Sequence, residues 1–263
     1  METSSLNKII NKKREKLSLL KKKIKIEDLE YKINKFDKYL NFKEKIYSNF
    51  LKDKFSLIAE IKKASPSAGV IIEDYNPVEI ASIYEKNNAT CLSVLTEEDY
   101  FNGSLDHISK IKEKINLPIL CKDFFIDKFQ IPLAKSFGAD AILLIVAALN
   151  QNQLEELYNT ALEYKMSVII EVHTIEEAKR ITSFKNAIIG INNRNLKTLK
   201  TDLNNTFEIC KTLNSFDGIL VSESGIKNKD DVLKISNQTN IKTFLIGESL
   251  LKNLNSNSIF SIL

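Results

Sequence analysis

Several short apolar runs of the chain end in a charged or amide side chain, and these side chains could form one active site. Glu60 and Lys62 end the first run, Lys122 the third and Glu171 the fifth. The sixth, seventh and eighth runs end in a further group: Asn192, Arg194, Glu223, Ser224 and Gly247. Positioned Lys and Glu side chains can act as general acids and bases. Any one of them could instead be a salt bridge at the rim of a sheet, but that explanation is weak for the whole set.

The apolar runs that precede these residues are continuous and rich in β-branched side chains, as in parallel strands buried on both faces. We predict strands at residues 56–61, 90–95, 118–122, 141–146, 167–172, 187–192, 218–222 and 243–247. Segments with helical apolar spacing lie between them, such as residues 77–87, 154–164 and 175–181. Eight such units predict an α/β fold, a closed (β/α)8 TIM barrel, in which the carboxyl ends of all strands meet at one mouth.

Length and composition are compatible with this architecture. A length of 263 residues suits one α/β barrel or two small domains, and a hydrophobic content of 43% is enough for a packed core. No G-x-G-x-x-G follows the first predicted strand, which argues against a dinucleotide-binding fold. We therefore expect a single domain, with the barrel at residues 55–263 and a helical extension at residues 1–54.

The predicted extension is strongly basic, with 16 Lys and Arg against 8 Asp and Glu, whereas the whole chain has a net charge of +4. A basic arm can bind nucleic acid. Here, however, the charges are interleaved with apolar residues at roughly helical spacing, which is typical of amphipathic helices that pack on a protein body. These apolar residues are Ile9, Leu17, Leu20, Ile24, Leu29, Ile33 and Leu40. We expect helices packed on the barrel and no nucleic-acid partner.

The remaining composition indicates a cytoplasmic protein that is not bound to a membrane. The longest apolar run, residues 141–149, is too short to cross a bilayer, and the polar N-terminus lacks the apolar segment of a secretory signal. Cys91, Cys121 and Cys210 show neither metal-ligand nor CxxC spacing, which is typical of free thiols in a reducing compartment.

Eight longer motifs occur in order along the predicted barrel. They are IAEIKKASPSAG (58–69), LSVLTEEDYFNGS (92–104), LPILCKDFFID (117–127), GADAILLIVAAL (138–149), IIEVHTIEEA (169–178), IGINNRNLKT (189–198), LVSESGI (220–226) and FLIGESLL (244–251). Together with the amphipathic extension, these motifs resemble the indole-3-glycerol phosphate synthase family over nearly the whole chain. The chain ends soon after the eighth unit, so we expect a monofunctional carboxy-lyase of tryptophan biosynthesis.

The resemblance implies a substrate and a reaction. The substrate is the sugar phosphate carboxyphenylamino-deoxyribulose 5-phosphate, and ring closure gives indole-3-glycerol phosphate, CO2 and water. No metal, organic cofactor or obligate protein partner is implied. The sequence agrees on metals, because His107 and His173 lie far apart without ligand spacing. His173 follows the fifth strand near Glu171, and we interpret it as a solvent-facing or hydrogen-bonded structural residue.

The resemblance also assigns roles to individual residues. Lys122 matches the general acid that polarises the substrate ketone, Glu171 matches the general base, and Lys62 matches the lysine that contacts the substrate carboxylate and takes part in dehydration. Glu60 precedes Lys62 by two residues, so both point to the same side of a strand; Glu60 could hold a lysine or bind a substrate hydroxyl.

The other matching positions have orienting or binding roles. Orientation is assigned to Asn192 and Glu223, carboxylate recognition to Ser65 and Arg194, and contact with the anthranilate ring to Phe101 and Phe124. Core packing is an alternative for Phe124. Backbone amides at the starts of short helices are expected to bind the phosphate, and these belong to Ser224, Gly225, Gly247 and Glu248.

Two positions depart from the family pattern. Ala68 replaces the Lys of SPSKG and Asn195 replaces the Asp of NNRDL. We expect these changes to affect the conformation of the loops, and neither position carries the expected chemistry.

Three alternative functions stay open. A related phosphate-binding barrel, phosphoribosylanthranilate isomerase, would carry a Cys/Asp pair at strand ends. A catalytically silent barrel would lack one of Lys62, Lys122 or Glu171. A nucleic-acid binder would show a salt-dependent gel shift.

Overall fold

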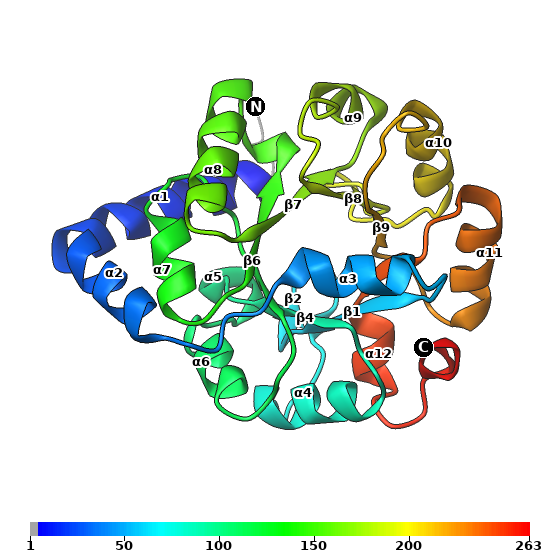
Figure 1. The fold of residues 1–263 in the computed structure, drawn as a ribbon, viewed down its shortest axis with the longest axis horizontal. Helices are drawn as coiled ribbons and strands as arrows, with labels where there is room; N and C mark the ends of the chain where they lie inside the picture. The colour runs from blue at the N-terminus through cyan, green and yellow to red at the C-terminus, as the bar shows by residue number, and fades with distance from the viewer. Residues whose placement is uncertain (1–4) are drawn as a thin grey trace.

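A closed barrel of eight parallel strands lies at the centre of the computed structural model, which describes residues 5–263, with the side chain of Ser5 left out (Figure 1). The strand order around the barrel is β1-β10-β9-β8-β7-β6-β5-β4. The strands are β1 (Ser56–Ile61), β4 (Cys91–Leu95), β5 (Ile119–Lys122), β6 (Ala141–Ile145), β7 (Ser167–Val172), β8 (Ile188–Asn192), β9 (Leu220–Glu223) and β10 (Thr243–Ile246). The predicted (β/α)8 barrel is confirmed.

The strand boundaries differ from the predicted ones by at most two residues. The largest difference is at β9, which begins at Leu220 and includes Glu223, so this carboxylate belongs to the strand itself. The loop after β1 also contains a hairpin that the sequence did not predict, formed by β2 (Ala64–Ser65) and β3 (Gly69–Val70). Strands of two residues are too short to produce a periodic pattern.

Helices surround the barrel, and most of the buried apolar side chains lie between the helices and the strands (Figure 1). Asn76, Asn150, Thr174 and Asn228 begin α4, α8, α9 and α11 by accepting hydrogen bonds from backbone N–H groups of the first turn. The outer helices are α4 (Pro77–Lys86), α5 (Glu98–Phe101), α6 (Asp106–Lys112), α7 (Gln130–Ser136), α8 (Gln151–Glu163), α9 (Ile175–Arg180), α10 (Asn204–Thr212), α11 (Lys229–Thr239) and α12 (Glu248–Lys252).

Three further helices precede the first strand: α1 (Ser5–Lys23), α2 (Ile26–Lys35) and α3 (Phe42–Phe50). Helix α3 lies across the barrel at the amino ends of the strands (Figure 1). Its Phe42 and Ile46 are fully buried and pack with the side chains of the barrel interior. The α3 helix therefore closes the bottom of the barrel. Residues 1–4 of the predicted extension lie outside the described residues.

Helix α1 lies at the opposite end of the barrel, against the loops that follow β4 and β5. Its lysines pair with acidic side chains of these loops: Lys12 with Asp99, Lys13 with Asp123, Lys16 with Glu98 and Asp99, and Lys21 with Asp127. Much of the positive charge of the extension is thus matched within the molecule. No helix within residues 5–263 is both long and apolar enough to span a membrane.

Candidate active site

Four charged side chains form one layer at the carboxyl end of the barrel interior. They come from alternate strands: Glu60 of β1, Lys122 of β5, Glu171 of β7 and Glu223 of β9. Side chains alternate along a strand, so residues two positions apart point to the same side. The residues two positions earlier all belong to the apolar interior of the barrel, and they are Ile58, Leu120, Ile169 and Val221. Barrel interiors are usually filled by such four-residue layers. Here the last layer is charged.

Lys122 is at the centre of this layer. Its Nζ lies 2.9 Å from Glu223 Oε2, 3.4 Å from Glu60 Oε2 and 3.7 Å from Glu171 Oε2. Burial alone would lower the pKa of Lys122, but the three carboxylates, Glu223 foremost, raise this pKa above its usual value. Lys122 therefore keeps its proton at neutral pH. The neighbouring Asp123 is not its partner, because that carboxylate pairs with Lys13 at 2.7 Å.

The three carboxylates of the layer are not equivalent. For Glu171 and Glu60, burial alone would raise the pKa, but the adjacent lysines outweigh it and hold both pKa values below the usual value. For Glu223, burial and the nearby Glu171 together raise the pKa to about 8, although Lys122 opposes them. Glu171 therefore titrates at lower pH than Glu223 and is ionised at neutral pH.

Two glycines provide the space that these carboxylates occupy. A Cβ atom at Gly190 would lie 2.1 Å from Glu223 Oε1, and one at Gly247 would lie 2.5 Å from Glu60 Oε1. A side chain at either position would displace the carboxylate, so the two glycines allow Glu223 and Glu60 to lie against the neighbouring strand backbones. Gly247 thus has a packing role beside the anion-binding role that the sequence suggested.

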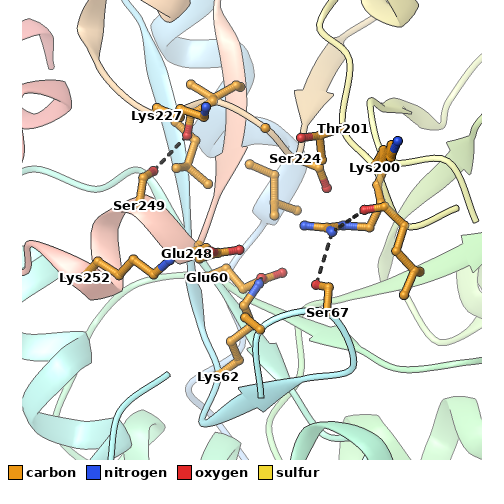
Figure 2. A pocket seen from close by; sticks show the side chains of 18 of the residues that line it. Glu60, Lys62, Ser67, Lys200, Thr201, Ser224, Lys227, Glu248, Ser249 and Lys252 are labelled. Atoms are coloured by element: carbon orange, nitrogen blue, oxygen red, sulfur yellow. Dashed lines mark hydrogen bonds and ion pairs between the residues drawn. The ribbon is translucent and has the colours of Figure 1, made fainter. Parts of the chain in front are cut away.

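Lys62 and Arg194 extend from the layer towards the loops. Lys62 forms an ion pair with Glu60, as their two-residue spacing predicted, and the two side chains point towards each other in Figure 2. Arg194 donates hydrogen bonds to Ser67 Oγ at 3.1 Å and to the Leu199 carbonyl at 2.8 Å. The guanidinium therefore connects the loop after β8 with the loop after β1.

Polar residues of these loops are held in place by local hydrogen bonds. Asn192 Oδ1 accepts from the Arg194 N–H at 2.9 Å, and Ser65 Oγ accepts from the Ala68 N–H at 3.2 Å. Asn195 Oδ1 accepts from the N–H groups of Lys197 and Thr198. A carboxylate oxygen could accept the same two bonds, so the Asn at position 195 preserves this turn.

An apolar cavity of about 170 Å³ adjoins the charged layer. Phe101 and Phe124 line it, together with Leu143, and both aromatic rings are half-buried rather than enclosed in the core. Leu6 and Ile9 of α1 line the same cavity, which the sequence did not predict for them individually. Their helical spacing indicated a packed helix, but not which part of the barrel the helix would contact.

A second, larger cavity of about 900 Å³ opens on the other side of Glu60 and Lys62 (Figure 2). Ser224, Gly225, Gly247 and Glu248 line it, as do the cationic side chains of Lys62, Lys122, Arg194, Lys200, Lys227 and Lys252. Ser224 and Gly225 have positive φ angles of 67° and 79°. Consecutive residues with turned backbone can present their N–H groups to one anion. The Glu248 carboxylate is paired with Lys252 at 2.6 Å.

His173 lies directly behind Glu171, so of its two expected settings, solvent-facing or structural, the solvent-facing one is wrong. It is 8% exposed, and its Nε2 lies 3.2 Å from Glu171 Oε1. The two-residue spacing that predicted the Glu60–Lys62 pair also applies here and could have revealed this contact. Within residues 5–263 there is no group of three or more His, Cys, Asp or Glu side chains arranged to hold a metal ion.

The structure thus brings all fourteen residues of the predicted site to the same end of the barrel, around two adjoining cavities. Glu60, Lys62, Lys122, Arg194 and Ser224 line both cavities. Glu223 is fully buried and lines neither cavity, but it accepts a hydrogen bond from Lys122, which lines both. An ammonium group, an ionised carboxylate, an apolar cavity and a cationic cavity are therefore adjacent. A substrate with an aromatic part and an anionic part would fit this arrangement.

Comparisons with known proteins give one family name along nearly the whole chain. Residues 6–261 match the family described as indole-3-glycerol phosphate synthase. A Prochlorococcus marinus protein of that name is 45% identical over 252 residues, covering 94% of this chain and 84% of that protein. An Aliarcobacter butzleri protein of the same name is 42% identical over 254 residues, covering 94% and 93%. A solved structure titled tryptophan synthase alpha chain from Legionella pneumophila has a TM-score of 0.61 at 10% identity, over 85% and 94% of the two chains, a likeness of fold alone.

Proposed function

The chain belongs to the indole-3-glycerol phosphate synthase family, and from this premise we propose that Lys122 and Glu171 are the acid and base of its ring-closing reaction. The reaction converts carboxyphenylamino-deoxyribulose 5-phosphate into indole-3-glycerol phosphate, CO2 and water. The observation that carries the proposal is the position of the Lys122 ammonium among three buried carboxylates at the barrel mouth.

Lys122 is the general acid of the first step. Its ammonium donates to the substrate ketone while the aromatic ring carbon attacks it, and this hydrogen bond strengthens as negative charge grows on the oxygen. An interaction that is stronger in the transition state raises kcat rather than affinity alone. The raised pKa of Lys122 supports the role, because the proton is present at neutral pH.

Glu171 is the general base that removes the ring proton during dehydration, and Lys62 is the acid that assists the departure of the hydroxyl as water. Glu171 is ionised at neutral pH, as a base must be before it can accept a proton. Glu60 holds Lys62 and Lys122 in place. Glu223 orients Lys122, and Asn192 orients the substrate.

The two cavities are assigned to different parts of the substrate. We assign the anthranilate ring to the apolar cavity, between Phe101 and Phe124, and its carboxylate to Arg194, Ser65 and Lys62. The phosphate is assigned to the larger cavity, at the amides of Ser224, Gly225, Gly247 and Glu248. Among partners, we propose a small sugar phosphate and neither nucleic acid nor an obligate protein.

A cytoplasmic location is part of the same proposal. Cys91 and Cys121 are buried, Cys210 is half-buried, and all three are free thiols. Unpaired cysteines are the normal state in a reducing compartment. Cys91 and Cys121 pack among the apolar side chains of the barrel, which also weakens the alternative of an isomerase with a cysteine acid at the mouth.

The activity is tested directly with the purified chain and the synthetic substrate. Indole-3-glycerol phosphate is fluorescent, so its formation can be followed continuously. We expect turnover without added metal or cofactor, and unchanged turnover after treatment with EDTA. Failure to form the product at substrate concentrations up to the millimolar range would refute the proposed function.

A further inference from the structure

We propose that His173 is a positioning residue, which as an imidazolium keeps the Glu171 carboxylate ionised and oriented towards the barrel axis. The inference rests on the proposed role of Glu171 as the general base and extends it to a residue that lines neither of the two cavities. His173 contacts the substrate only through Glu171, so it is not itself a catalytic residue.

The contact follows from the geometry of β7. Glu171 lies in the strand and His173 follows its last residue, so both side chains point to the same side. Glu171 therefore has a cation on each flank: Lys122 Nζ lies 3.7 Å from Oε2, and His173 Nε2 lies 3.2 Å from Oε1. Because both residues are almost completely buried, water screens this interaction little.

The backbone of His173 is fixed from two outer helices. The backbone N–H of His173 donates to Glu177 Oε2 of α9 at 2.7 Å, and its carbonyl accepts from Asn205 Nδ2 of α10 at 3.1 Å. The Glu177 carboxylate also lies 3.5 Å from His173 Nδ1. Because its backbone is fixed in this way, His173 keeps its ring next to the Glu171 carboxylate.

The charges around His173 favour the imidazolium form. The groups that face it are Glu171 from β7, Glu177 from α9 and the neutral Asn205 from α10. Burial alone would lower the pKa of His173, but the two carboxylates raise it to about 9. On the far side of Glu171 lie Lys122 and Glu223.

Removal of the imidazolium would leave Lys122 as the cation next to Glu171, and Lys122 also pairs with Glu223 and Glu60. Glu223 already illustrates the consequence, since burial and its acidic neighbour raise its pKa to about 8. The pKa of Glu171 would likewise rise, so the base would be protonated up to a higher pH. The acidic limb of the kcat profile reports the pKa of the base in the substrate complex and would move to higher pH.

The charge state of His173 can be measured without an activity assay. The chain has two histidines, His107 and His173, so 15N NMR of the histidine rings gives two sets of signals, and the variant His107→Gln assigns them. We expect His173 to be doubly protonated at pH 7 and to titrate near pH 9. In Glu171→Gln, it should titrate at lower pH. A neutral His173 ring at pH 7 would overturn the proposal.

Kinetics test the effect on Glu171. The variant His173→Gln keeps a hydrogen-bond donor and loses the charge. We expect kcat at pH 7 to fall by on the order of tenfold, the lower range for a residue that orients a reacting group, with KM within about twofold of the wild type. The acidic limb should move to higher pH.

A second variant, Glu177→Gln, tests the charge of His173. In Glu177→Gln, His173 loses one neighbouring anion and deprotonates at lower pH, so the basic limb of the kcat profile should move to lower pH. Glu176→Gln, on the exposed side of α9, is the matched control.

A wild-type acidic limb in His173→Gln would overturn the proposal, even if the thermal midpoint fell, because His173 would then stabilise the fold only. The parallel measurement of Glu171→Gln separates this result from a failure of the proposed function. If Glu171→Gln keeps wild-type kcat, the general-base role is wrong. If Glu171→Gln is inactive and His173→Gln is unaffected, only the role of His173 is wrong.

Discussion

Glu171 and Glu223 are both buried next to the Lys122 ammonium, but their pKa values shift in opposite directions. Burial raises both, and Lys122 lowers both; His173 lowers the pKa of Glu171 further, whereas the acidic neighbour Glu171 raises that of Glu223 to about 8. Glu171 is therefore ionised at neutral pH, whereas Glu223 takes up a proton more readily. Pairs of acids separated in this way are typical of acid–base active sites.

The variant Glu171→Gln is expected to remove the base with little effect on binding. The amide has nearly the same shape and cannot accept the ring proton, so kcat should fall on the order of 10²- to 10⁴-fold, the usual contribution of a positioned proton-transfer group. Steady-state kinetics at pH 7 measure this, with Glu176→Gln as the control. A raised KM with unchanged kcat would mean that Glu171 is a binding residue.

At the residue scale, the sequence predicted the members of the site better than their contacts. Strand-end position and two-residue spacing identified Lys122 and the Glu60–Lys62 pair. Glu60 and Glu171 lie 3.4 and 3.7 Å from Lys122, but the nearest carboxylate is that of Glu223, 101 positions away along the chain, which no local spacing indicates. The strands β5 and β9 lie four places apart in a ring of eight. Only closure of the barrel places them opposite each other.

At the scale of elements, the extension contacts the barrel at both ends. Helix α3 fills the bottom with Phe42 and Ile46, whereas α1 lies over the loops at the mouth, where Lys13 pairs with Asp123 next to Lys122. Amphipathic spacing predicted that these helices would pack, but spacing alone could not specify which surface each one covers. The division of the chain into residues 1–54 and 55–263 stays a prediction.

Helix α1 is expected to contribute to substrate affinity through Leu6 and Ile9, which line the apolar cavity. The double variant Leu6→Ala/Ile9→Ala should raise KM by roughly 30-fold, because each truncation loses on the order of 1 kcal/mol of apolar contact and the two losses add to about 2 kcal/mol. The value of kcat should stay within about twofold. Lys8→Ala, an exposed change on the same helix, is the control.

Deletion of residues 1–50 should weaken binding as well, but it also removes Phe42 and Ile46 from the barrel interior. Its thermal midpoint should therefore fall together with its affinity, and the double variant separates the two effects. If the double variant and the deletion both keep wild-type KM, the extension does not take part in substrate binding.

At the scale of the whole molecule, the distribution of charge determines where an anionic ligand binds, and the net charge does not. The net charge is +4, yet the larger cavity is lined by six cationic side chains and by the carboxylates of Glu60 and Glu248. A cavity of one sign concentrates ligands of the opposite sign. The cationic loops could not be located from the composition, because Lys200, Lys227 and Lys252 follow different strands.

Inorganic phosphate is expected to bind in this cavity at the amides of Ser224, Gly225, Gly247 and Glu248. It should inhibit competitively with the substrate, and more strongly than chloride at equal ionic strength. The Glu248 carboxylate should stay paired with Lys252, turned away from the anion, because like charges repel. A crystal soaked in phosphate without density between the loops after β9 and β10 would contradict the assignment.

The central claim is that the Lys122 ammonium is the general acid, and the most direct test is kcat of Lys122→Met. Methionine keeps an unbranched side chain and deletes the charge, so the fold should survive, as judged by circular dichroism against the exposed control Lys128→Met. Lys122→Arg should restore little activity, because a guanidinium is bulkier and holds its proton more firmly. We predict that kcat of Lys122→Met falls by at least about 10²-fold, the lower range for such a group. A folded Lys122→Met enzyme that keeps more than about a tenth of the wild-type kcat would contradict the claim.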